Sequence, residues 1–60
     1  MWYGNMTPEL EKLYDEYYNV FGGDPDEYDE LEYGANEYDD YIKDIKTSIR
    51  LKRELPSINE

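Results

Sequence analysis

The chain has 60 residues, of which 16 are acidic and 6 are basic, and its formal net charge at pH 7 is −10. It contains no cysteine and no histidine, which excludes a disulfide framework and the usual zinc sites as stabilising devices. A chain this short encloses one small core, so a single domain over residues 1–60 is expected. Aromatic residues make up 17% of the chain, which favours a folded domain over a disordered acidic tail.

The sequence shows neither a membrane span nor a secretory leader. No stretch approaches the roughly 20 apolar residues that a spanning helix needs. The first residues lack a basic region followed by an apolar run. We therefore expect a soluble, cytoplasmic protein with no membrane partner.

The pattern at Thr7-Pro8-Glu9 predicts a helix start. Thr7 can cap the helix, and proline is tolerated at its first position because the missing N–H has no partner there. Gly22-Gly23 supplies a left-handed stop. The helical spacing of the apolar side chains predicts a helix over 8–21, and these side chains are Leu10, Leu13, Tyr14, Tyr17, Val20 and Phe21.

A second start pattern follows at Asp24-Pro25-Asp26-Glu27, where a cap residue precedes a proline and a glutamate lies three residues after the cap. Only about nine residues separate Pro25 from Gly34, and that is short for a helix. Residues 25–34 are therefore predicted to form either a short helix or an ordered acidic loop.

Asn36 is the predicted cap of a last helix, which has acids in its first turn and must end before Pro56. Its apolar stripe comprises Tyr38, Tyr41, Ile42, Ile45 and Ile49. Its basic residues lie where cations stabilise the C-terminal carbonyls of a helix. Leu51 lies opposite the stripe, so either the helix distorts near Arg50, or Leu51 and Leu55 serve a separate contact.

These elements predict an all-α protein. The expected architecture is a small antiparallel helical hairpin, or a three-helix domain, with a short acidic middle segment. Trp2 and Tyr3 are expected to fold back over the helix pair, because an exposed terminal tryptophan is unfavourable.

The residue types argue against an enzyme. Without histidine or cysteine no nucleophilic triad can be assembled, and 60 residues can hardly enclose a cleft that raises a carboxyl pKa. A calcium-binding loop that started at Asp24 would need a glycine at position 29 and a glutamate at position 35. The chain has Asp29 and Ala35 there, so it does not match this loop. We therefore expect no catalytic residue, no metal site and no cofactor.

Nine carboxylates and no basic residue fall within residues 21–40, and they form the candidate binding site: Asp24, Asp26, Glu27, Asp29, Glu30, Glu32, Glu37, Asp39 and Asp40. One interpretation is a solvated surface that confers solubility. The other is a surface that imitates a nucleic-acid backbone. If residues 24–40 were largely helical, their carboxylates would recur every ~2.8 Å of axis, close to the ~3.4 Å charge spacing of one DNA strand.

In size, acidity and lack of catalytic residues, the chain is similar in character to DNA-mimicking inhibitors of nucleases, a likeness of composition without a shared motif. The hypothesis is a non-catalytic protein-binding module. Its sharpest form is a nucleic-acid mimic that occupies the basic groove of a DNA- or RNA-binding protein. The alternative is a small cytoplasmic helical interaction domain whose acidity serves only solubility. Direct nucleic-acid binding is disfavoured by the charge, and the sequence leaves the oligomeric state open.

Overall fold

The computed structural model describes residues 1–58, and in these residues it is helical, without a β-strand. The elements are α1 (Pro8–Phe21), the 3-10 helix η1 (Ala35–Glu37), α2 (Tyr38–Leu51) and the 3-10 helix η2 (Leu55–Ser57). The predicted all-α class is confirmed.

Helix α1 has the bounds and caps that its sequence predicts. The Thr7 hydroxyl accepts a hydrogen bond from the Leu10 N–H at 3.1 Å. At the other end, Gly22 has a φ of 77°, and its N–H donates to the Tyr18 carbonyl at 2.7 Å. Glycine adopts this left-handed conformation without the steric cost that a Cβ imposes, so the helix ends there.

Residues 22–34, here called the connector, form turns rather than a third helix. Its backbone bonds are local: the Glu27 N–H donates to Asp24 at 3.3 Å, and the Leu31 N–H donates to Tyr28 at 3.2 Å. Of the two predicted forms for this segment, the structure shows the ordered acidic loop. A helix of so few residues cannot offset its nucleation cost, and neighbouring carboxylates repel one another.

The predicted cap at Asn36 is wrong. Asn36 lies within η1, which leads directly into α2, and Glu37 occupies the cap position of α2. The Glu37 carboxylate instead accepts a hydrogen bond from the Gly34 N–H at 2.9 Å. The glutamate side chain thus reaches back three residues and satisfies one of the free N–H groups at this helix start. Asn36 is a more common capping residue type, so the sequence pattern pointed to it and not to Glu37.

Helix α2 ends at Leu51, before Pro56 as predicted, and the chain reverses at Lys52. Lys52 has a φ of 55°, and the Arg53 N–H donates to the Ser48 carbonyl at 3.1 Å, as in a Schellman motif. This turn separates the two leucines. The side chain of Leu51 is 47% exposed, whereas that of Leu55 is 3% exposed and lies in the core.

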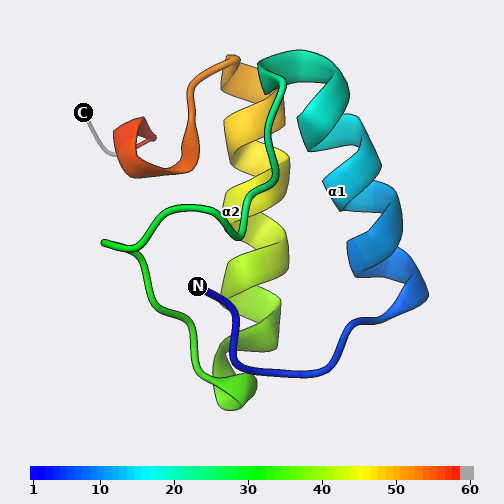
Figure 1. Ribbon diagram of the computed structural model, residues 1–60, viewed down its shortest axis with the longest axis vertical. Coiled ribbons are helices and arrows are strands. Elements are labelled where there is room, and N and C mark those ends of the chain that lie inside the picture. Colours follow the sequence, from blue (N-terminus) through cyan, green and yellow to red (C-terminus); the bar gives the residue numbers. More distant parts are fainter. Residues whose placement is uncertain (59–60) are drawn as a thin grey trace.

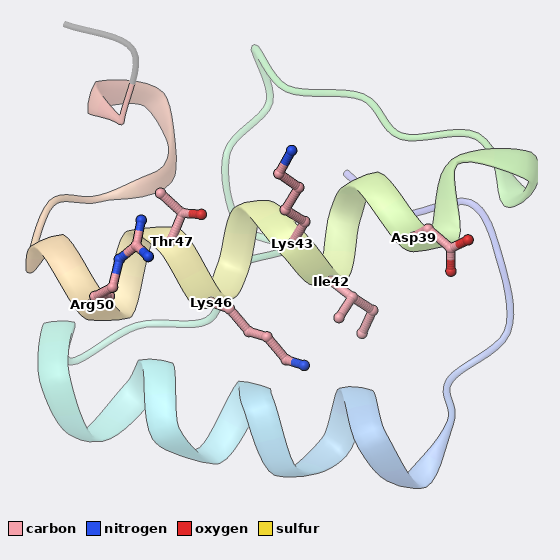
Figure 2. Close-up of a pocket in the computed structure, with 6 residues that line it drawn as sticks. All are labelled: Asp39, Ile42, Lys43, Lys46, Thr47 and Arg50. Atoms are coloured by element: carbon pink, nitrogen blue, oxygen red, sulfur yellow. The ribbon is translucent and has the colours of Figure 1, made fainter.

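The two long helices run in parallel, so the predicted antiparallel arrangement is wrong. Figure 1 shows both helices rising in the same direction, with the connector returning from the end of α1 to the start of α2, and Figure 2 shows the same relation from another side. The hydroxyls of Thr7 and Tyr38, at the starts of the two helices, are 2.8 Å apart. A tight loop favours an antiparallel pair, whereas residues 22–34 can span up to about 40 Å and allow the chain to return to the level where α1 starts before α2 begins.

The core lies between the helices and is closed by η2. Its buried side chains are Leu10, Leu13 and Tyr17 from α1, Tyr41, Ile42 and Ile45 from α2, and Leu55 from η2.

The N-terminal segment covers this core at one side, as expected for Trp2. The Trp2 ring stacks on Tyr41 with ring centroids 5.0 Å apart. Tyr3 does not cover the core as expected: its side chain is 58% exposed.

The same N-terminal segment pairs with the connector as a short ladder. The Tyr3 N–H donates to the Tyr33 carbonyl at 3.0 Å, and the Tyr33 N–H donates to the Met1 carbonyl at 2.8 Å. Trp2 and Tyr33 form an isolated parallel bridge. The connector is therefore held from both sides although it has no regular secondary structure.

Candidate functional site: an anionic surface on the connector

All nine predicted site residues are exposed. Six lie on the connector, Glu37 lies on η1, and Asp39 and Asp40 lie in the first turn of α2. The structure therefore places them on one continuous stretch of chain that follows α1 and enters α2 (Figure 1).

The regular charge ladder assumed for residues 24–40 is not present. The connector contains turns at residues 25–26 and 29–30, so its carboxylates do not recur at a helical rise. The comparison with the charge spacing of a DNA strand therefore no longer applies. What remains is an exposed anionic surface of irregular spacing.

Three of the nine carboxylates also hold the fold together. The Asp26 carboxylate accepts a hydrogen bond from the Trp2 N–H at 2.7 Å, and Glu32 accepts one from the Tyr3 hydroxyl at 3.2 Å. Glu37 accepts the bond from Gly34 described above. Sequence reasoning assigned all nine to one role, because a bond between segments far apart in the chain has no local signal.

No ion pair joins a site carboxylate to a cation among residues 1–58. The one ion pair in this part of the chain links Lys46 to Glu9, with 3.7 Å between Nζ and the carboxylate. The site carboxylates that hold no segment in place therefore keep a charge that no ion pair in this part of the chain offsets.

Two tyrosines attach the connector to the helices. The Tyr28 hydroxyl lies 2.5 Å from that of Tyr17 on α1, and the Tyr33 hydroxyl donates to the Asp44 carboxylate on α2 at 2.8 Å. Burial, together with these hydrogen bonds, raises the pKa of both Tyr28 and Tyr33 above the ordinary value. Both rings are therefore neutral at pH 7 and act as anchors beneath the acidic side chains.

The cations gather elsewhere, on α2. Lys43, Lys46 and Arg50, here called the cationic face, line a shallow surface pocket of about 470 Å³ together with Asp39, Ile42 and Thr47. Figure 2 shows Lys46 extending toward α1 while Lys43 extends away from it. The spacing of three and four residues along a helix is the sequence signal that places these cations near one another.

A second hollow, of about 380 Å³, lies beside the N-terminal segment. It is lined by Trp2, Gly4, Asn5, Thr7, Ala35 and Tyr38. The rings of Trp2 and Tyr38 form one wall, with centroids 5.9 Å apart. It contains no carboxylate from the predicted site.

Among residues 1–58, no three carboxylates converge closely enough to hold a metal ion. None of the helices in this part of the chain has the length and hydropathy needed to cross a bilayer.

Comparison of the chain with protein-family models, with curated proteins and with solved structures finds no match.

Proposed function

We propose that this protein is a non-catalytic binding module whose acidic connector docks against a basic surface of another protein, in the manner of a nucleic-acid mimic. The observation that carries the proposal is the exposure of nine carboxylates with no ion pair to any cation among residues 1–58. Carboxylates held in this way attract a groove lined by lysine and arginine and displace its counterions, as phosphates do.

The attachment of the connector supports binding by a preformed surface. Tyr28 and Tyr33 bond to the helices, and Trp2 bonds to Asp26. A segment fixed at several points loses little conformational entropy on binding, so more of its electrostatic attraction appears as affinity. The proposed mimicry therefore depends on a fixed irregular display of charge and not on a helical ladder.

The alternative is a helical interaction domain whose acidity serves solubility. It is favoured by exposed apolar side chains on both long helices. Tyr18 is 57% exposed and Val20 is 43% exposed on α1, and Leu51 is exposed at the end of α2. Trp2 and Leu55, by contrast, pack in or on the core and are unsuitable as probes of a docking surface.

The test uses neutralising variants that leave the structural carboxylates in place. Glu27→Gln, Asp29→Asn and Glu30→Gln together remove three exposed connector charges, and Asp26 and Glu32 stay intact. The matched control is Glu11→Gln, Asp15→Asn and Glu16→Gln, which removes three exposed charges from α1.

The probe is a panel of basic DNA-binding domains, each holding a fluorescent DNA duplex, and displacement of the duplex is measured at several salt concentrations. We expect displacement by the native protein, a steep loss with salt, and at least a tenfold weakening by the connector variant alone. Equal weakening by both triple variants would reduce the effect to total charge and contradict the proposal. Binding that survives both variants and is lost with Val20→Ser and Leu51→Ser would establish the alternative.

A further inference from the structure

The cationic face of α2 is unusual in a protein with a net charge of −10. Lys43, Lys46 and Arg50 surround a shallow pocket that also contains the apolar Ile42. Of these three cations, only Lys46 forms an ion pair among residues 1–58, with Glu9 on α1. Two of the three cations on this face are therefore without a carboxylate partner in that part of the chain.

The connector carries a complementary set of charges. Glu27, Asp29 and Glu30 are exposed and form no ion pair among the described residues. Along α2, Lys43 and Arg50 are separated by about 10 Å at 1.5 Å per residue. The three carboxylates extend over at most about 10 Å of chain, and over less because residues 29–30 form a turn, so they fit within the length of the cationic face.

These two surfaces do not neutralise each other within one molecule, because no ion pair joins the connector to the cationic face in residues 1–58. They can do so between molecules. We propose that the cationic face of α2 is the docking site for the acidic connector of a second copy of this chain.

Net charge opposes such an association and local charge favours it. The repulsion between two anionic molecules is a sum over long distances, and it is screened beyond a Debye length of about 8 Å at physiological salt. Ion pairs at contact are shorter than this length and are screened less. The complex is therefore expected to be weak, with self-association at protein concentrations near 1 mM.

The contact would cover the connector, so self-association and binding of a basic partner compete for the same carboxylates. The inference does not rest on the proposed function, because it requires no other protein. A monomer at every concentration would remove the inference and leave the DNA-displacement assay unaffected.

The experiment is sedimentation equilibrium of purified variants at about 0.15 M salt. One variant reverses the cationic face with Lys43→Glu and Arg50→Glu, and another reverses the connector with Asp29→Lys and Glu30→Lys. A third carries all four changes, which restores both the native net charge and the complementarity of the two surfaces. Circular dichroism is used to test whether each variant is folded.

We expect the native protein and the fourfold variant to self-associate, and each twofold variant to bind itself at least tenfold more weakly. The matched control, Asp15→Lys with Glu16→Lys on α1, changes net charge as the connector reversal does and should still self-associate. If the reversal of the cationic face is unfolded, Lys43→Gln with Arg50→Gln replaces it and should weaken association about tenfold. A monomeric native protein at 1 mM, or loss of association in the α1 control, would overturn the inference.

Discussion

The Tyr17 hydroxyl accepts a hydrogen bond from the buried backbone N–H of Leu55 at 3.1 Å, across 38 positions of sequence. The same hydroxyl lies 2.5 Å from the hydroxyl of Tyr28. One oxygen on α1 thus bonds to both the connector and η2, two segments that pack against the core without belonging to a long helix.

Removal of this oxygen is expected to destabilise the fold. Tyr17→Phe leaves the ring in the core but deprives the Leu55 N–H of its acceptor, and an unsatisfied buried donor costs about 1–3 kcal/mol. Urea unfolding monitored by circular dichroism measures the change. Tyr18→Phe removes a hydroxyl from an exposed neighbour and should alter stability by less than about 0.5 kcal/mol. Equal effects of the two changes would contradict the role assigned to Tyr17.

A charge at the centre of the core is expected to unfold the protein. The side chain of Ile45 is 0% exposed, and an unpaired charge buried there costs several kcal/mol, comparable to the whole stability of a domain this small. Ile45→Asp should therefore abolish the helical far-UV spectrum. Leu51→Asp introduces the same group at an exposed position of α2 and should cost no more than about 1 kcal/mol. A folded Ile45→Asp protein would show that the core differs from the one described.

The left-handed residue at the end of α2 offers a stabilising change. Lys52 has a φ of 55°, a conformation that costs about 1–2 kcal/mol for residues with a Cβ and is natural for glycine. After allowance for the greater freedom of glycine in the unfolded chain and for the lost cation, Lys52→Gly is expected to gain about 0.5 kcal/mol. Lys52→Ala removes the same charge and keeps the Cβ, so it should not stabilise the protein. Urea midpoints of the three proteins provide the comparison.

Sodium chloride is expected to raise the melting temperature. The exposed carboxylates of the connector repel one another, and none of them is paired with a cation among residues 1–58. Added salt screens this repulsion over a Debye length of about 10 Å at 0.1 M and about 3 Å at 1 M. A gain of about 1 kcal/mol would raise the melting temperature by roughly 4–8 °C. A melting temperature indifferent to salt would mean that the carboxylates are already neutralised.

The tyrosine hydroxyls make the fold sensitive to alkaline pH. Burial and hydrogen bonding raise the pKa values of Tyr28, Tyr33 and Tyr41 in the folded protein. In the unfolded chain each returns to its ordinary value of about 10. Because the folded state holds these protons more tightly, the stability they contribute is complete below pH 10 and is lost as pH rises from there toward the folded values.

An alkaline titration tests this relation. Tyrosinate absorbance and far-UV circular dichroism are followed together as the pH is raised. Tyr28, Tyr33 and Tyr41 should ionise together with loss of the helical signal, in one cooperative step. Ionisation of these three tyrosines with the helical signal intact would contradict the burial described here.

The local structure could be predicted from the sequence alone. The bounds of α1 follow from Thr7, Pro8 and Gly22, whose effects act within one turn of helix. The apolar stripe of α2 could also be predicted, because the periodicity of side chains depends only on the helix geometry. The burial of Leu55 could not be predicted in this way. It requires the chain to reverse at Lys52, and lysine is not a residue type that indicates a left-handed turn.

The relative direction of the helices and the form of the acidic segment depend on contacts between distant parts of the chain. Two amphipathic helices can bury their stripes in either relative direction, and the choice depends on how the connector packs. Here the bonds from Tyr28 and Tyr33 to the helices, and from Asp26 to Trp2, hold it as an extended return path. Such contacts join residues far apart in the chain and have no periodic signature. Because of these contacts, the nine carboxylates form an irregular surface and not the expected ladder. Some of these acids maintain the fold, and others remain available for binding.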